Sequence, residues 1–265
     1  MGNEAPQFNP TGLGAYSPSE VARRIEEAGI AKSRLPAVPL MTLAVLAGSF
    51  IALGAAAFTA VMAGTDLSFG PARLLGGLVF SLGLVLVVVA GAELFTGNTL
   101  IVMAWVDRKI RLRDLLRNWV FSFAGNAAGA LAIVVLMALT GLLKGQVGEL
   151  AIRIAEAKAS LGWTEALTRG ILCNMLVCLA VWLTFAARDV AGKILAILLP
   201  ISAFVLLGFE HSIANLYLIP AGWMAGAQVG WGGFLGNLVP VTIGNIIGGA
   251  GGVALTYHLA YRPGG

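Results

Sequence analysis

Two segments of this chain, more than a hundred residues apart, carry the same polar pattern inside apolar surroundings. Gly91–Asn98 and Gly208–Asn215 both read Gly-x-Glu-x-x-x-x-Asn. Each follows a run of Val, Leu and Ala that is long enough to lie in lipid. A carboxylate and an amide at membrane depth are costly, and they normally line a path for a substrate or an ion. The repeated pattern therefore predicts a polar pathway inside a membrane protein.

The composition is that of a polytopic membrane protein. Of the 265 residues, 58% are hydrophobic and 11% are charged, whereas about 25% are charged in soluble domains. The net charge of +4 is small and is confined to the predicted loops. We therefore expect Lys and Arg to orient the chain in the bilayer, and we expect no nucleic-acid partner.

The sequence gives no indication of a metal or another cofactor. Cys173 and Cys178 are five residues apart on an apolar helix, so they point to different faces and cannot bridge each other locally. No set of Cys, His and carboxylate residues stands at metal-ligand spacing. We expect both cysteines to be packing residues.

The first 35 residues are predicted to form a polar arm, and residues 36–262 the membrane domain. The arm has no secretory signal pattern. Ser17, Pro18 and Glu20 form a helix start with a capping box, and Gly29 is expected to end that helix. We expect its apolar stripe to lie on the membrane surface or on a neighbouring subunit. The stripe consists of Val21, Ile25 and Ala28.

Six apolar spans follow the arm. The second and fifth contain the two polar patterns and are expected to be broken helices. Lipid tolerates irregular backbone only where protein buries it or it faces a cavity, so both breaks should point inward. The spans are predicted at Val38–Ala63, Leu74–Val106, Trp119–Leu143, Ala166–Ala187, Ile194–Trp223 and Phe234–Tyr261.

A second duplicated motif accompanies the first. Gly125-Asn126-x-x-Gly129 in the third span matches Gly244-Asn245-x-x-Gly248 in the sixth. Asn126 follows Glu93 by 33 residues, and Asn245 follows Glu210 by 35 residues. Three spans are therefore repeated as three spans, and the odd number forces the second copy to insert upside down. The predicted fold is an all-α membrane protein with a 3+3 inverted repeat and two broken helices. The paired glycines are expected to let helices approach closely.

The basic residues are unevenly divided between the two sides of the predicted membrane domain. Twelve fall on one side and five on the other, so both termini are predicted to be cytoplasmic. The twelve are Arg23, Arg24, Lys32, Arg34, Arg108, Lys109, Arg111, Arg113, Arg117, Arg188, Lys193 and Arg262; the five are Arg73, Lys144, Arg153, Lys158 and Arg169.

Four segments of the chain resemble the signature segments of the formate/nitrite transporter family. They are Gly91–Asn98 with Leu100-Ile101-Val102, Gly170–Asn174, Gly208–Asn215 and Pro240–Asn245. The resemblance extends over Tyr16–Tyr261. It implies six spans per subunit in an aquaporin-like inverted repeat, a homopentamer with one pore per subunit, and a place in the bacterial inner membrane. Aquaporins themselves match poorly, because neither half carries Asn-Pro-Ala.

The resemblance also implies roles for particular residues. It makes His211 the central pore histidine, with Thr96 in the loop opposite it and Asn174 alongside. Lys158 matches a periplasmic-side lysine of the family, and Lys32 resembles a lysine before the first span. Hydrophobic narrowings are implied at Phe80, Leu84 and Phe204 on the periplasmic side and at Leu94, Phe95 and Val177 on the cytoplasmic side.

The chemistry of a dry pore suggests what the histidine would do. Moving a small anion into a low dielectric costs several kcal/mol even after relaxation, and of order 20 kcal/mol in the idealised limit. Protonating a carboxylate of pKa about 4 at pH 7 costs only about 4 kcal/mol. His is the side chain that titrates near neutrality. We therefore hypothesise that Lys32 and Lys158 concentrate the anion, that His211 protonates it, and that Thr96 and Asn174 orient the anion or the imidazole.

The other polar residues of the breaks are interpreted as structural. Glu93 and Glu210 are expected to accept hydrogen bonds from exposed backbone at the breaks, although they could also be conducting carboxylates. The asparagines are expected to tie the half-helices to their neighbours. They are Asn98, Asn126, Asn215 and Asn245.

Alternatives remain open for substrate, function and gating. Glu-Leu-Phe-Thr-Gly at residues 93–97 resembles the nitrite branch, whereas residues 80–84 and 178–182 resemble the formate branch. Formate is the first choice, and nitrite and hydrosulfide are alternatives. A membrane enzyme using His211, Glu210 and Ser212 is a remote alternative because adjacent residues rarely meet in the required geometry. The arm Met1–Leu35 could close the cytoplasmic mouth at low pH or bridge subunits.

Overall fold

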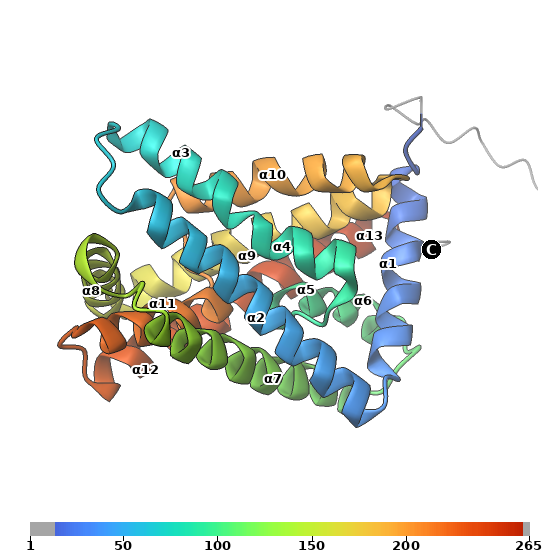
Figure 1. Cartoon of the computed structure of the whole chain (residues 1–265). Coiled ribbons are helices and arrows are strands. Elements are labelled where there is room, and N and C mark those ends of the chain that lie inside the picture. The colour runs from blue at the N-terminus through green and yellow to red at the C-terminus, as the bar shows by residue number, and fades with distance from the viewer. Residues whose placement is uncertain (1–13, 262–265) are drawn as a thin grey trace, which may run out of the picture.

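The computed structural model describes residues 14–261, and over this range the chain is helical without any strand. The long helices run side by side through the molecule (Figure 1). The first helix, α1 (Pro18–Ser33), stands across one end of the bundle, and α8 (Gly145–Ala159) lies at the opposite end. Residues 1–13 of the predicted arm, and Arg262 of the tail, lie outside the described residues.

Within residues 14–261, five helical segments are long and apolar enough to cross a membrane, so the chain is a multi-pass membrane protein. They are α2 (Ala37–Met62), the run Phe69–Gly91, α7 (Leu112–Leu139), α9 (Trp163–Ala186) and the run Trp231–Tyr261. These five match five of the six predicted spans. The remaining one, the fifth predicted span at Ile194–Trp223, contains two shorter helices, α10 (Val190–Leu206) and α11 (Ser212–Ala225).

The predicted breaks are confirmed in both places. The run that begins with α3 (Phe69–Phe80) and continues through α4 (Leu82–Val85) and the π-helical η1 (Leu86–Gly91) stops at Gly91. Helix then resumes in α5 (Phe95–Asn98), the 3-10 turn η2 (Thr99–Ile101) and α6 (Val102–Val106). Gly91 and Gly208 have φ values of 83° and 70°. This left-handed conformation favours glycine, which explains why each pattern begins with one.

The duplicated glycines pack helices tightly, as predicted. Gly129 of α7 lies against the carbonyl of Val45 in α2. Gly248 lies in the π-helical η3 (Ile247–Leu255), which continues α12 (Trp231–Ile246) toward α13 (Thr256–Tyr261), and it packs against the carbonyl of Ile171 in α9. A Cβ atom at either glycine would overlap these carbonyls, so a larger residue would push the helices apart.

Helix α1 differs from its prediction in two respects. The Ser17 cap and the Glu20 capping box are confirmed, but the helix continues past Gly29 to Ser33. Gly29 packs against η2, where its Cβ would lie 3.3 Å from the Cα of Ile101, so this glycine serves close contact rather than termination. Val21 and Ile25 of the stripe are buried in one cluster with residues 100–104 of the same chain, a contact that the sequence did not predict. The place of the helix at a membrane surface or a neighbouring subunit stays a prediction.

Helix α8 was absent from the sequence prediction. Its fully buried residues are all small, namely Gly148, Ala151 and Ala155, while Val147, Ile152 and Ile154 are only partly buried. Gly222 of α11 packs directly against Ala151 and Ala155. A face of glycine and alanine gives little apolar periodicity, which is why hydrophobicity did not reveal this helix.

Candidate functional site

The two breaks meet at one hydrogen bond in the interior. Thr96 Oγ1 of the first break lies 3.0 Å from His211 Nε2 of the second. Both residues are buried. The residues that the sequence predicted to lie opposite each other are therefore in direct contact.

The other contacts of His211 determine which ring nitrogen carries the proton. His211 caps the start of α11, where its Nδ1 accepts a hydrogen bond of 3.1 Å from the backbone N–H of Ala214. A nitrogen that accepts cannot hold a proton, so the neutral imidazole carries its proton on Nε2 and donates it to Thr96. The ring also stacks on Phe204, with centroids 6.1 Å apart.

At the first break, a lysine, a carboxylate and two asparagines form a buried network. Glu93 accepts from Lys32 Nζ at 2.6 Å and from Asn98 Nδ2 at 2.8 Å. Asn98 also donates to Asn118 Oδ1 at 2.9 Å, and Asn118 in turn donates to the Lys32 carbonyl at 3.1 Å. The network joins α1, the break and α7.

At the second break the same residue types form the same network. Glu210 accepts from Lys158 Nζ at 2.9 Å and from Asn215 Nδ2 at 2.7 Å. Asn215 donates to Asn237 Oδ1 at 2.7 Å, and Asn237 donates to the Lys158 carbonyl at 3.0 Å. Helix α8 thus has the role at this break that α1 has at the first.

The backbone of each break is held by an asparagine, not by the glutamates. Asn126 accepts from the N–H of Phe95 and donates to the carbonyls of Glu93 and Ala44. Asn245 repeats this arrangement with the N–H of Ser212 and the carbonyls of Glu210 and Gly170. The expectation that Glu93 and Glu210 accept from break backbone is therefore wrong, because their oxygens bind the lysines and Asn98 or Asn215. Each of the four asparagines donates to a residue of a neighbouring helix: Asn98 to Asn118, Asn126 to Ala44, Asn215 to Asn237 and Asn245 to Gly170.

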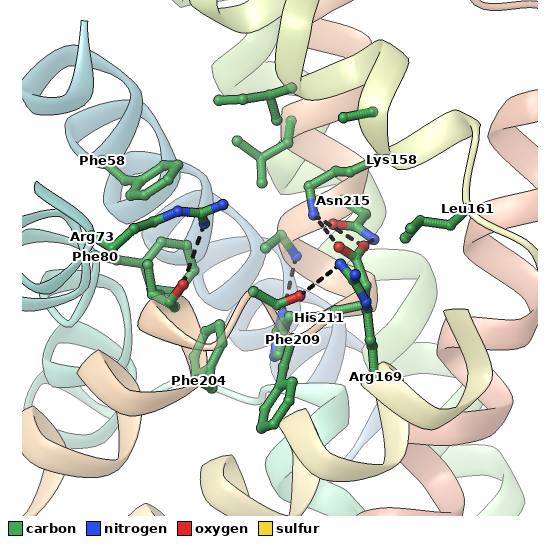
Figure 2. Close-up of a pocket in the computed structure, with 17 residues that line it drawn as sticks. Phe58, Arg73, Phe80, Lys158, Leu161, Arg169, Phe204, Phe209, His211 and Asn215 are labelled. Atoms are coloured by element: carbon green, nitrogen blue, oxygen red, sulfur yellow. Dashed lines mark hydrogen bonds and ion pairs between the residues drawn. The ribbon is translucent and has the colours of Figure 1, made fainter. Parts of the chain in front are cut away.

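A cavity of about 160 Å³ adjoins the second break, and we call it the His211 cavity. Phe80, Phe204 and His211 are in its wall, and the ring centroids of Phe80 and Phe204 lie 5.4 Å apart. Figure 2 shows Arg73 on one side of this cavity, and Lys158 and Arg169 on the other.

A second cavity of about 600 Å³ adjoins the first break, and we call it the Glu93 cavity. Its wall includes Leu84 and Leu94 as well as Lys32 and Glu93. Tyr16 also borders it, and two guanidinium groups lie over its ring, that of Arg24 at 3.6 Å from the centroid and that of Arg188 at 4.5 Å.

The six residues implied as narrowings are all buried, but they occupy different places. Phe80 and Phe204 border the His211 cavity, and Leu84 and Leu94 border the Glu93 cavity. Phe95 and Val177 border neither of these two cavities. The Phe95 ring packs edge-on against Phe123 of α7, with centroids 5.2 Å apart.

Asn174 supports the site from behind. Its Nδ2 donates to the carbonyl of Thr96 at 3.2 Å, to Thr99 Oγ1 at 3.2 Å and to the carbonyl of Asn245 at 2.6 Å. Asn174 therefore fixes the backbone that carries Thr96 and ties it to the last helical run, and reaches His211 only through Thr96.

Two further sequence interpretations can be compared with the structure. Cys173 and Cys178 are both buried and unbridged, as expected of packing residues.

In the enzyme alternative, His211 would have to activate Ser212. The imidazole instead bonds to Thr96 and Ala214, and Ser212 Oγ has no hydrogen-bond partner within residues 14–261. The required contact is missing.

Sequence reasoning did not identify four of the residues that build this site. Asn118 and Asn237 complete the two networks. Asn118 stands before Asn126, and Asn237 before Asn245, in the same spacing Asn-x7-Asn, and this repeat could have identified them. Arg73 and Arg169 were used only to predict orientation, yet both border the His211 cavity. Nothing in their sequence surroundings distinguishes them from ordinary loop arginines.

Comparison with known sequences places the chain among anion transporters. The family model for the formate/nitrite transporter family matches residues 19–259. An uncharacterised transporter of Bacillus subtilis, YrhG, is 45% identical over 249 residues, which cover 92% of this chain and 93% of the relative. The formate channel FocA of Escherichia coli K12 is 39% identical over 267 residues, covering 92% and 94%.

Solved structures show the same similarity. An ion channel of this family superposes with a TM-score of 0.86 at 27% identity, covering 91% of this chain and 99% of that one. A pentameric formate channel with formate bound superposes with a TM-score of 0.77 at 36% identity, covering 86% and 98%.

Proposed function

The chain belongs to the formate/nitrite transporter family, and we propose that it conducts small monovalent anions, formate first among them, through a pore inside each subunit. The relatives named as formate channels, together with the pentameric structure that binds formate, support this substrate and a homopentamer. Nitrite is the second candidate, because residues 93–97 resemble the nitrite branch. The observation that carries the proposal is the contact between Thr96 and His211 at the meeting point of the two breaks.

We place the chain in a bacterial inner membrane as six spans in a 3+3 inverted repeat. The matched networks of Glu93 and Glu210, and the matched backbone contacts of Asn126 and Asn245, support the repeat. Helices α10 and α11 together supply the fifth span. Residues 1–35 form a cytoplasmic arm, residues 36–262 form the channel, and both termini are cytoplasmic because most of the Lys and Arg residues are predicted on that side.

In this arrangement the Glu93 cavity opens to the cytoplasm and the His211 cavity to the periplasm. Phe80 and Phe204 form an apolar narrowing beside the His211 cavity. Leu84, which the resemblance put on the periplasmic side, borders the Glu93 cavity with Leu94, so it is assigned here to the cytoplasmic narrowing. These buried rings and alkyl groups cannot solvate a bare anion, so the neutral acid crosses at a far smaller cost. Phe95 and Val177, which the resemblance assigns to the cytoplasmic narrowing, are buried in the same apolar cluster as Leu94.

His211 supplies the proton in this proposal. A neutral imidazole with its proton on Nε2 cannot act as an acid near neutral pH, so the ring must first bind a proton at Nδ1 and give up the hydrogen bond from Ala214. The imidazolium then transfers its Nε2 proton to an oxygen of the anion, which leaves neutral acid and neutral histidine. Thr96 orients Nε2 for this step. Lys32 and Lys158 add positive charge to the cavity walls while holding Glu93 and Glu210.

The substrate is tested by uptake into proteoliposomes that contain a pH-sensitive dye. Formate, nitrite and hydrosulfide are offered separately under a step in external pH, with empty liposomes as the control. The proposal expects the fastest protein-dependent flux with formate, and a rate that rises as the external pH falls. Protein-dependent flux of none of the three anions would contradict it.

A further inference from the structure

The cations around the His211 cavity are not equivalent. Lys158 is held by both oxygens of Glu210, at 2.9 and 3.0 Å. Arg169 bonds to Glu165, which lies outside the cavity wall. Arg73 alone among the three has no carboxylate partner in residues 14–261. The positive charge of the cavity is therefore compensated everywhere except at Arg73.

Most N–H donors of the Arg73 guanidinium make no hydrogen bond within residues 14–261. Its Nη1 donates to the carbonyl of Val205 at 3.3 Å, and its charge lies 5.5 Å from the ring centroid of Phe69. A guanidinium has five N–H donors in a planar fork, so this single hydrogen bond leaves most of them unused. Figure 2 shows the group reaching into the cavity from the side opposite Lys158.

The position of Arg73 relates it to the pore narrowing. Arg73 and Phe80 are seven residues apart on α3, which places them on one face of the helix about 10 Å apart along its axis. An anion bound at Arg73 would therefore lie two helical turns from the Phe80–Phe204 pair, toward the N-terminal end of α3, which is on the periplasmic side in the proposed orientation.

We propose that Arg73 is the receptor that captures the anion in the His211 cavity before it reaches the narrowing, and that it favours anions with two acceptor oxygens. A planar guanidinium pairs with a carboxylate or nitrite through two parallel hydrogen bonds, whereas a lysine offers only a point charge. This inference rests on the proposed anion conduction. If Arg73 had only a structural role, capping the last carbonyls of α10, its substitution would not change the discrimination between anions.

The test compares Arg73→Gln and Arg73→Lys with wild type in proteoliposomes. Arg153→Gln is the control, because it removes the same charge from an exposed position on α8 outside the cavity wall. At limiting formate and low ionic strength, Arg73→Gln should lower uptake about tenfold, through a higher KM. The loss should shrink as salt is raised, because screening removes long-range attraction. Arg153→Gln should leave uptake within about twofold of wild type.

Specificity is read from competition. Nitrite should inhibit wild-type formate uptake more strongly than chloride does. In Arg73→Lys the ratio of inhibition by nitrite to inhibition by chloride should fall several-fold, while size exclusion shows the assembly intact. Unchanged KM in Arg73→Gln, or an unchanged nitrite-to-chloride ratio in Arg73→Lys, would overturn the receptor role. Failure of the wild-type protein to conduct any anion would instead overturn the proposed function.

Discussion

Thr96 Oγ1 and His211 Nε2 lie 3.0 Å apart although 115 residues separate them in the sequence. Each residue lies at a break in a helix, and each break contains its own network of glutamate, lysine and asparagine side chains. The contact therefore joins two independently supported structures. The orientation of the imidazole depends on both of them, which makes it sensitive to changes on either side.

The hydroxyl of Thr96 is expected to matter more than its methyl group. Thr96→Val removes the hydrogen-bond partner of Nε2 and should lower formate uptake about tenfold, since one buried hydrogen bond contributes about 1 kcal/mol and leaves a donor unsatisfied when lost. Thr96→Ser keeps the hydroxyl and should stay within about twofold of wild type. Initial rates in proteoliposomes measure both, and equal rates for the valine and serine variants would refute this role.

The two buried ion pairs should differ in their contribution to stability. The side chain of Lys158 is 15% exposed, whereas that of Lys32 is 32% exposed. Glu210→Gln should destabilise the protein by about 3–5 kcal/mol, because it leaves a poorly solvated ammonium group. Glu93→Gln should cost less, because Lys32 can turn toward water.

Thermal unfolding in detergent compares these two variants with Glu149→Gln at an exposed position. Adding Lys158→Met to Glu210→Gln should recover part of the lost stability, because the unpaired charge is then gone. The explanation fails if Glu93→Gln proves the more damaging of the two.

The asparagines that hold the break backbone should be intolerant of truncation. Asn126→Ala and Asn245→Ala each leave one N–H and two carbonyls without their partner. Unsatisfied buried groups cost about 1–3 kcal/mol apiece, so both variants should lose most of their folded assembly on size exclusion. A wild-type unfolding temperature in either variant would contradict the assignment.

The docking of α1 should depend on pH through Glu26. Burial raises the pKa of the Glu26 carboxyl above its ordinary value of 4.5, and Asp107 raises it further, although Lys109 at 2.8 Å opposes the change. The folded state therefore binds the proton more tightly than the unfolded state, and α1 loses stability as the pH rises above 4.5.

Hydrogen exchange of the α1 amides, corrected for intrinsic rates, measures this effect. Protection should be greater at pH 5 than at pH 7.5, and Glu26→Gln should remove most of the difference. Glu27→Gln, on the exposed neighbour, should leave the difference in place. Protection that increases from pH 5 to pH 7.5 in the wild type would be the opposite of the expected sign.

Much of the architecture could be predicted because lipid imposes strict rules on sequence. Spans of about 20 apolar residues, and polar residues at two interruptions, leave few alternatives once the pattern is duplicated. The meeting of Thr96 and His211 was predicted from family resemblance, since no spacing rule brings residues 115 positions apart into contact. Helix α8 was missed because its fully buried residues are glycine and alanine, and its larger apolar residues are only partly buried.

The glutamates were misassigned because spacing does not reveal competition for a hydrogen-bond acceptor. Glu93 and Glu210 stand beside exposed break backbone in the sequence, but two distant lysines and two nearby asparagines occupy their oxygens. An ammonium group is the stronger partner for a buried carboxylate. The break backbone is left to Asn126 and Asn245, whose amides can donate and accept at once.

The central claim is that His211 supplies the proton that accompanies each anion. Proton and formate uptake should be measured together in proteoliposomes of wild type, His211→Gln and His258→Gln. His258 is the control because it is also buried but lies outside both cavities, where its Nε2 is 3.4 Å from Asp107 Oδ1. The account predicts about one proton per formate in wild type and His258→Gln, and formate uptake without matching proton uptake, or no uptake, in His211→Gln. Proton-coupled formate uptake at the wild-type rate in His211→Gln would contradict it.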